Sequence, residues 1–283
     1  MTDREMPLKA DNTNIDCHIH LSERSDDKLI PFAKMNGFKY VLDEITQIMK
    51  RNDTVAGLLL SPPVNDWSPS PNEEIIQLAK RSKGILYPVI TLENSNVSID
   101  NALKIAERNQ VKGFKIMLGY QAVYPDDEIF TRLYDYCEEK RVPVLFHTGD
   151  TASREGSLRH SHPLNLDALA NSRPELRIVA CHFGNPWVME TAELVYKHEH
   201  FYADISGLFA GKDGMYSSKY FDYIVGSINR AIYYIGGCER ILFGSDYPVS
   251  PPDLVLKLVM SLDISSRDRR RILYENAKEL FAI

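Results

Sequence analysis

The chain has 283 residues, of which 44% are hydrophobic and 25% are charged, a composition typical of an ordinary folded protein with a large core. Its formal net charge of −6 argues against nucleic acid or an anionic membrane surface as a partner. The sequence has no run of about 18 apolar residues and its first residues are polar, so we expect neither a membrane span nor a secretory signal.

Eight short β-rich runs alternate with longer helical patterns along the chain. Most of these runs are nearly continuous hydrophobic stretches, as expected for strands that are buried on both faces of a parallel sheet. The predicted strands cover residues 13–19, 55–61, 84–90, 112–118, 142–148, 176–182, 201–207 and 240–246.

The segments between these strands have the apolar spacing of amphipathic helices. The predicted helices cover residues 41–52, 72–82, 98–109, 126–140, 186–197 and 267–281. Strands and helices that alternate in this way predict an α/β fold, a (β/α)8 TIM-like barrel that forms a single domain over residues 1–283. An open doubly wound sheet is the alternative, but no G-x-G-x-x-G motif follows any predicted strand.

The cysteines do not form a metal-binding or disulfide pattern. Cys17, Cys137, Cys181 and Cys238 are scattered and include no C-x-x-C pair. This distribution argues against a structural zinc site of the cysteine type and favours a reducing, cytoplasmic location.

Histidines lie at the carboxyl ends of three predicted strands, where barrels of this kind carry their active sites. His18 and His20 end the first strand, His147 ends the fifth and His182 ends the sixth, while Asp246 ends the eighth. Because strand side chains alternate, the two histidines of the first strand point the same way. A single histidine at a strand end is usually a hydrogen-bonded core residue, but imidazoles and a carboxylate together favour a divalent metal, with zinc preferred.

Two neighbouring positions support this interpretation. Leu242, Gly244 and Asp246 share one strand face by alternation, and the glycine leaves room below the carboxylate. Asp16 shares the face of His18 and His20, so it either orients a metal ligand or is an interior residue hydrogen-bonded to the backbone.

The other four histidines fall outside the strand ends. His160 and His162 lie in a Ser/Arg-rich loop, where we favour a loop role and keep substrate contact as the alternative. His198 and His200 precede the seventh strand, at the face of a barrel that contributes to stability, so we expect them to be structural.

Several spaced motifs together resemble the amidohydrolase superfamily, and more narrowly the amidohydrolase 2 group, which includes aminocarboxymuconate-semialdehyde decarboxylase. The motifs extend from residue 15 to about residue 250 and read I-D-x-H-x-H, G-F-K, P-V-x-F-H-T-G, H-P-x-N-L-D, C-H-F-G, D-I-S-G and I-L-F-G-S-D-Y-P. The resemblance implies a TIM-like barrel with a catalytic metal at its mouth. It also suggests a homodimer.

The resemblance assigns roles to the residues at the strand ends. By position, His18, His20, His147 and Asp246 match the metal ligands of the family. His182 matches the histidine that binds the catalytic water in members with one metal, and that ligates a second metal in members with two.

Two departures from the decarboxylase branch affect the expected reaction. The residues after His20 are Leu-Ser-Glu rather than the branch's x-x-P, and an arginine that pairs with carboxylates in that branch has no clear counterpart. We therefore expect a metal-dependent hydrolase of a small ester, lactone or amide. The alternative is a non-oxidative decarboxylase of an unsaturated or aromatic acid, with Arg154 and Arg159 holding the carboxylate. A barrel that binds without turnover is a third hypothesis, which the intact donor set argues against.

In the expected mechanism, one Zn²⁺ activates a water molecule, with Mn²⁺ or another transition metal as the alternative. Asp246 serves as both metal ligand and general base, and His182 steadies the water or the developing oxyanion. Lys115 lies near the position of the carboxylated lysine that bridges two metals in some relatives, and it is otherwise a residue of the site wall. The expected partner is a small-molecule substrate. Candidate contacts to it are Lys115, Tyr120, Asp150, Arg154, Arg159, Asn185, Trp187 and Tyr247.

Overall fold

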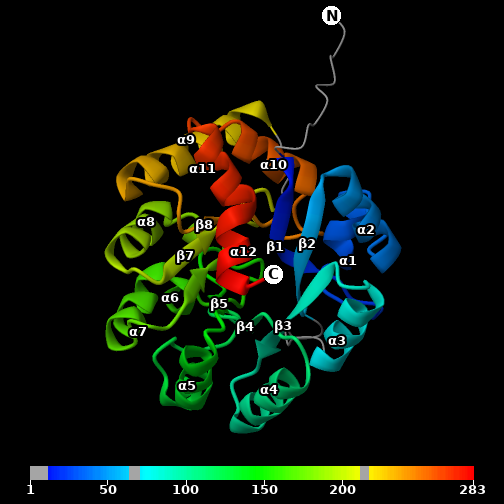
Figure 1. Cartoon of the computed structure of the whole chain (residues 1–283), viewed down its shortest axis with the longest axis vertical. Helices are drawn as coiled ribbons and strands as arrows, with labels where there is room; N and C mark the ends of the chain where they lie inside the picture. Colours follow the sequence, from blue (N-terminus) through cyan, green and yellow to red (C-terminus); the bar gives the residue numbers. More distant parts are fainter. Residues whose placement is uncertain (1–11, 64–70, 211–216) are drawn as a thin grey trace, which may run out of the picture.

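The chain folds around one sheet of eight parallel strands, arranged in the order in which they occur in the sequence (Figure 1). This computed structural model describes residues 12–63, 71–210 and 217–283. The strands are β1 (Asn14–His20), β2 (Thr54–Leu60), β3 (Leu86–Leu92), β4 (Gly113–Ile116), β5 (Val144–Phe146), β6 (Ile178–Ala180), β7 (Phe201–Asp204) and β8 (Ile241–Leu242). The predicted (β/α)8 barrel is thereby confirmed.

The barrel closes between its first strand and the chain that follows β8. The backbone N–H of Cys17 donates to the carbonyl of Phe243 at 2.9 Å, and that of His20 donates to the carbonyl of Tyr247 at 2.7 Å. Asp16 Oδ1 also accepts the backbone N–H of Ser245 at 2.8 Å. The last predicted strand, 240–246, is thus a strand only over Ile241–Leu242. The residues after it reach β1 through irregular backbone.

Helices cover the outside of the barrel. Those predicted from the sequence appear as α2 (Leu42–Arg51), α3 (Asn72–Arg81), α4 (Asn96–Arg108), α5 (Thr131–Lys140), α8 (Val188–Lys197), α11 (Ser266–Arg270) and α12 (Asn276–Phe281). A π-helical turn joins the last two. The helix expected to begin at Pro163 appears as α7 (Leu166–Ser172), which follows a 3-10 turn over Pro163–Asn165. The sequence analysis did not predict α1 (Ile30–Met35), α6 (Leu158–Ser161), α9 (Ser218–Ile235) and α10 (Pro252–Met260).

The alternation along each strand separates two parts of the core. Leu145 faces a cluster inside the barrel, whereas its neighbours Val144 and Phe146 belong to the larger cluster that packs against the outer helices. The inner cluster also includes Leu280 and Phe281 of α12, a helix that lies across the end of the barrel in Figure 1. That end is therefore filled by apolar side chains, and polar groups gather at the other end.

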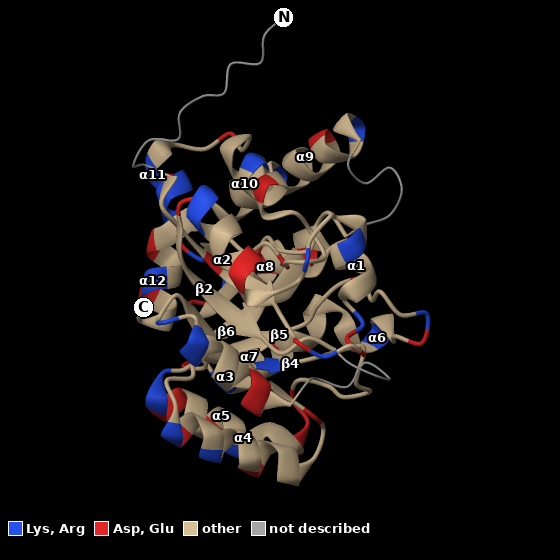
Figure 2. Cartoon of the chain, turned by 90° about the vertical axis from the view of Figure 1, so that its right-hand side faces the viewer, with Lys and Arg blue, Asp and Glu red and all other residues tan. Residues whose placement is uncertain are grey.

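Lys, Arg, Asp and Glu residues occur on the helices around the barrel, for example on α4, α5 and α11 (Figure 2). In the described part of the chain, no helix combines the length and the apolar character that a bilayer crossing requires.

Candidate metal centre and substrate cavity

The carboxyl ends of β1, β5, β6 and β8 bring the predicted histidines and Asp246 together. Asp246 Oδ1 lies 3.3 Å from His20 Nε2 and 3.6 Å from His18 Nε2. On the opposite side, His147 Nδ1 lies 3.1 Å from His182 Nε2. The rings of His18 and His182 link the two halves, with centroids 4.9 Å apart. The five side chains that the strand pattern singled out thus form one cluster.

Two of these side chains are oriented by left-handed backbone conformations that follow the strand ends. His182 has φ +61° and Asp246 has φ +65°, a region that non-glycine residues rarely occupy. Gly207 makes room between them, because a Cβ at this position would lie 2.5 Å from His182 Nδ1 and 2.9 Å from Asp246 Oδ2. Unusual backbone at a site of this kind is typical of functional residues that the surrounding fold holds in place.

Each of three histidines donates one ring N–H to an oxygen that can only accept it. His18 Nδ1 donates to the Asp204 carboxylate at 3.1 Å, and His20 Nδ1 to the carbonyl of Leu60 at 3.2 Å. His147 Nε2 donates to the carbonyl of Asp150 at 2.9 Å. Because a neutral imidazole carries one proton, the other nitrogen of each ring presents a lone pair to the cluster.

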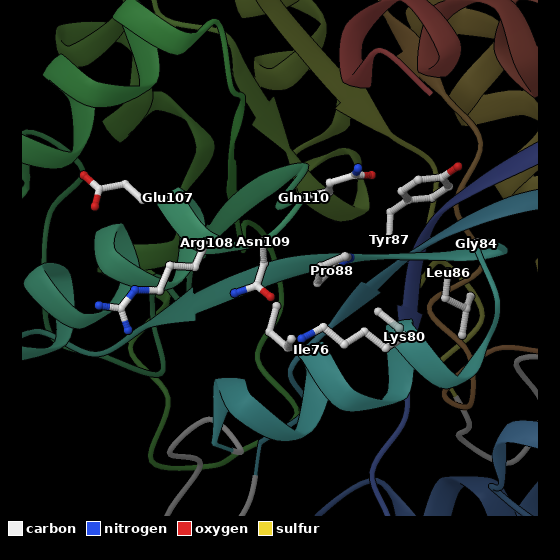
Figure 3. Close-up of a pocket in the computed structure, with 11 residues that line it drawn as sticks. Ile76, Lys80, Gly84, Leu86, Tyr87, Pro88, Glu107, Arg108, Asn109 and Gln110 are labelled. Carbon is white, nitrogen blue, oxygen red and sulfur yellow. The ribbon is translucent and has the colours of Figure 1, made fainter.

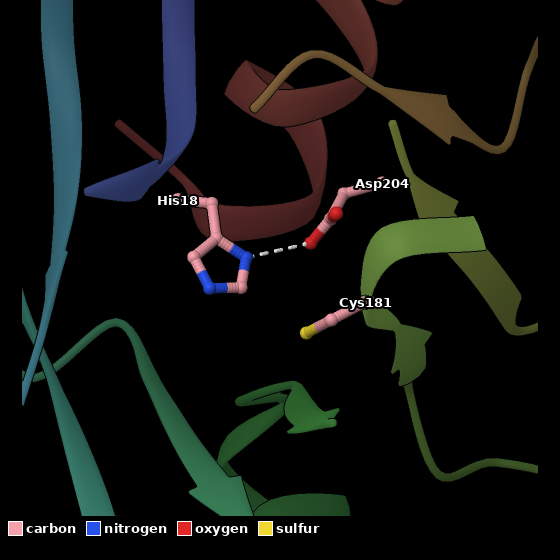
Figure 4. A group of neighbouring side chains, drawn as sticks. All are labelled: His18, Cys181 and Asp204. Atoms are coloured by element: carbon pink, nitrogen blue, oxygen red, sulfur yellow. Dashed lines mark hydrogen bonds and ion pairs between the residues drawn. The ribbon is translucent and has the colours of Figure 1, made fainter. Parts of the chain in front are cut away.

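Asp204 is the main residue of the site that the sequence reading missed. It is fully buried at the end of β7, where its Oδ1 accepts the backbone N–H of His182 at 2.9 Å and the hydroxyl of Ser206. Figure 4 shows its hydrogen bond to the ring of His18. The available signal was its place in D-I-S-G, at the carboxyl end of the seventh strand, the same topological position as the predicted ligands.

Two further buried groups lie beneath the histidines. Cys181 points into the space beside His18 and Asp204 (Figure 4). Its sulfur is 2.8 Å from Nζ of Lys115, which is only 1% exposed. Burial raises the pKa of the Cys181 thiol well above its ordinary value, against the opposing charge of Lys115. The thiol therefore remains protonated at neutral pH.

Burial and neighbouring charges favour the neutral imidazoles of His18, His147 and His182 and the ionised carboxylate of Asp246. Burial, assisted by the charge of Lys115, lowers the pKa of His18 to about 4. Burial also lowers the pKa of His147 and of His182. Burial opposes ionisation of Asp246, but its hydrogen bond to His20 and the surrounding imidazoles hold its pKa below the usual value. Neutral imidazoles and an ionised carboxylate are the protonation states that metal binding requires.

A cavity of about 360 Å³ opens above the cluster. Its floor includes His20, His147, His182 and Asp246. Of the predicted substrate contacts, Tyr120, Asp150 and Asn185 line it. The sequence analysis did not predict the other lining residues, which are mostly apolar and include one tyrosine of α9. Among them are Leu29, Phe32, Met117, Leu208, Val249 and, from α9, Tyr220.

The amidohydrolase family model, Amidohydro_2, matches residues 15–283. The chain belongs to this family.

As an amidohydrolase-family enzyme, the protein confirms the resemblance seen in its motifs. Its fold is shared by several solved structures. An amidohydrolase from Burkholderia multivorans with bound zinc is 20% identical, with a TM-score of 0.75 over 95% of this chain and 99% of that one. A putative 2-pyrone-4,6-dicarboxylic acid hydrolase from Pseudomonas putida is 20% identical, with a TM-score of 0.71 over 96% and 98%.

A third structure is a dihydroxybenzoic acid decarboxylase from Polaromonas with bound manganese and the inhibitor 2-nitroresorcinol. It is 17% identical, with a TM-score of 0.70 over 96% of this chain and 97% of that one. No curated protein matches the sequence.

The remaining predicted contacts lie outside the cavity wall. Lys115 is buried beneath the histidines, whereas Arg154, on the loop after β5, and Arg159, on α6, are exposed. The Trp187 ring packs against the ring of His162, with centroids 4.6 Å apart. Tyr247 is buried, and its hydroxyl is 3.4 Å from Glu44 on α2.

The other histidines make local contacts. His160 Nδ1 is 2.7 Å from the hydroxyl of Ser157, the residue before α6, and His162 Nδ1 accepts the backbone N–H of Leu164. His198 Nε2 is 2.8 Å from Asp167. His200 Nε2 is 3.8 Å from Glu175. Asp16 accepts the backbone N–H groups of His18 and Ser245, as expected of an interior residue bonded to the backbone.

A larger cavity, of about 560 Å³, lies on the outside of the barrel. It is formed by α3, the beginning of β3 and the end of α4, and Figure 3 shows Lys80, Tyr87 and Arg108 around it. It contains no histidine or cysteine among its described lining residues. Of these two cavities, the one above the histidines is therefore the better candidate for a metal site.

Proposed function

We propose that the protein is a metal-dependent hydrolase of a small ester, lactone or amide, with a divalent metal held at the mouth of the barrel. The observation that carries this proposal is the orientation of the histidine lone pairs. His18 Nε2 is fully buried and has no hydrogen-bond partner among the described residues. A buried nitrogen without a partner is costly unless a ligand satisfies it.

The contact between His147 and His182 supports the same conclusion. The Ser206 hydroxyl donates to Asp204, so it can only accept from His182 Nδ1, 2.9 Å away. His182 then carries its proton on Nδ1 and turns the lone pair of Nε2 toward that of His147 Nδ1, at 3.1 Å. Opposed lone pairs repel unless a cation or a proton lies between or beside them. The donors present therefore fit a divalent cation.

In this proposal, Nε2 of His18 and His20, Nδ1 of His147 and Oδ1 of Asp246 hold the metal. Nitrogen donors with one carboxylate favour Zn²⁺, with Mn²⁺ as the alternative. When bound, a divalent metal supplies Lewis-acid polarisation and a water acidic enough to react at neutral pH.

The chain's own groups perform the proton transfer. Asp246 is ionised, and its Oδ2 lies on the side of Gly207 and His182, away from the contact with His20. This oxygen accepts the proton of the attacking water and returns it to the leaving group. His182, held through Nδ1 by Ser206, orients the water and the developing negative charge.

Decarboxylation of an aromatic or unsaturated acid is the second candidate, because a structure of similar fold is a dihydroxybenzoic acid decarboxylase. In this chain the two arginines considered for holding a carboxylate, Arg154 and Arg159, are exposed and do not line the cavity. This placement supports hydrolysis over decarboxylation.

The test begins with metal analysis of protein purified without added metal, followed by reconstitution with Zn²⁺ or Mn²⁺. The reconstituted protein is then assayed with a panel of lactones and esters for proton release, and with hydroxybenzoic acids for carbon dioxide release. We expect one divalent ion per chain and metal-dependent proton release. Carbon dioxide release without hydrolysis would replace the proposal with the second candidate, and failure to bind any metal would reject both.

A further inference from the structure

We propose that Asp150 makes the cavity selective for uncharged substrates, and that it binds a hydrogen-bond donor such as a hydroxyl group on the part of the substrate that faces away from the metal. This inference rests on the proposed hydrolase function. It assigns the substrate class as a neutral, partly apolar lactone or ester that carries a hydroxyl. Substrates that carry a free carboxylate are excluded.

Backbone contacts fix Asp150 beside a proposed metal ligand. Its carbonyl accepts the Nε2–H of His147, and its N–H donates to the carbonyl of Asn185 at 2.8 Å. The preceding Gly149 has φ +93°, and a Cβ there would collide with that same Asn185 carbonyl. The main chain of Asp150 is thus held in place independently of its side chain.

The carboxylate of Asp150 is the group of this residue left for the substrate. Asp150 lines the cavity and is exposed to solvent. Its charge acts on two other residues of the wall. After burial, the negative charge of Asp150 is among the causes that raise the pKa of the Tyr120 and Tyr220 hydroxyls. Both tyrosines line the same cavity as Asp150.

Among the described residues, the rest of the cavity wall offers no cationic side chain to balance a negative charge on the substrate. None of its described lining residues is Lys or Arg. The second acid, Asp246, is committed to the metal in the proposed function. Most of the other wall positions are apolar, among them Leu29, Met117 and Leu208. A carboxylate placed against this wall would lose hydration and meet Asp150, whereas a hydroxyl could donate to it.

The test uses two benzohydroxamic acids with the same metal-binding head and different tails at the meta position, one a hydroxymethyl group and the other a carboxylate. Their dissociation constants are measured by calorimetry with the zinc-loaded full chain at low ionic strength. We expect the hydroxymethyl compound to bind about tenfold more tightly, because like charges at close range repel appreciably even near a solvated surface.

Two variants separate a local effect from a general change in charge. Asp150→Asn keeps both backbone contacts and should reduce the preference to about twofold, since the amide neither repels the carboxylate nor accepts as strongly. Asp43→Asn removes the same charge from an exposed position on α2 and should leave the preference unchanged.

Equal or tighter binding of the carboxylate compound by the unmodified protein would overturn the inference, and so would an equal effect of the two variants. If neither compound binds the zinc-treated protein, the metal centre itself is wrong, and the proposed function falls together with this inference. Selectivity lost while both compounds bind tightly would reject only the role of Asp150.

Discussion

The Nδ1 of His18 lies 3.1 Å from Oδ2 of Asp204, and both side chains are completely buried. Burial opposes ionisation of Asp204, but its contacts with His18, His182 and Ser206 hold its pKa far below the usual value. The ionised carboxylate therefore keeps the His18 proton on Nδ1. This pair determines which nitrogen of His18 faces the proposed metal.

Asp204→Asn should weaken metal affinity by about 10- to 100-fold, the usual effect of removing a carboxylate that orients a ligating histidine. The amide is similar in size but can turn its NH2 group toward His18 and favour the wrong tautomer. Zinc affinity is measured by competition with a chelator, and the melting temperature reports on the fold. Cys181→Ala is the matched control, because the sulfur beside this pair contacts Lys115, so metal affinity should be retained. Equal losses in both variants would place the metal deeper, between His18, Cys181 and Asp204.

Alanine substitution of His18, His20 or His147 should each remove the metal, since each supplies a lone pair to the cluster. His198→Ala should retain it, because this histidine pairs with Asp167 outside the site. Elemental analysis of the purified variants provides the comparison. Metal retained by the His18 variant and lost from the His198 variant would contradict the strand-end assignment.

Asp246→Asn should keep much of the metal, because the amide still offers a carbonyl oxygen, but the amide cannot accept a proton. We expect kcat to fall by about 10²- to 10⁴-fold, the usual contribution of general acid–base catalysis. His182→Asn should also lower kcat while one metal stays bound. Paired measurements of metal content and kcat test both variants. A near-normal kcat for Asp246→Asn would transfer the role of the base to His182.

Asp16 should make the metal-free protein less stable as the pH rises. Burial raises its pKa from 3.8 to about 7, although hydrogen bonds from Ser245 and His18 oppose the shift. A carboxyl group whose pKa is raised in the folded state stabilises the fold fully below pH 3.8, and this stabilisation is lost as the pH rises through about 7. We expect this group to lower the free energy of unfolding by about 1 kcal/mol between pH 6 and pH 8. Urea titrations of the parent and of Asp16→Asn, compared at each pH, isolate this group, and an identical pH dependence in both would contradict the prediction.

Most of the site residues that could be predicted from the sequence lie at the carboxyl ends of strands. A buried parallel strand leaves an unmistakable apolar run, so a histidine directly after it, such as His147, is placed at the barrel mouth by position alone. Asp204 ends its strand in the same way. However, a single acid at a strand end is equally compatible with a turn or a cap, and no histidine accompanies it at that strand end.

Other features depend on contacts that a sequence pattern does not encode. Alternation predicted a regular strand up to Asp246, but the backbone turns left-handed there to meet β1, so strand geometry ends at Leu242. The 18-residue helix α9 was missed, although Ile224, Ile228 and Ala231 repeat at helical spacing, because glycine and exposed tyrosines interrupt the pattern. The cavity wall combines residues of loops and helices, such as Leu29 and Tyr220, whose proximity arises only in the folded chain.

The hydrogen bonds between β1 and the residues after β8 affect when the site can form during synthesis of the chain. Asp246 donates its backbone N–H to the carbonyl of His18 at 2.8 Å, so a proposed ligand from the beginning of the chain and one from near its end are joined directly. A ribosome releases His18 more than 200 residues before Asp246. A nascent chain thus cannot assemble the complete donor set until nearly all of it has been synthesised. Tight metal binding would therefore follow closure of the barrel and would not direct its early folding.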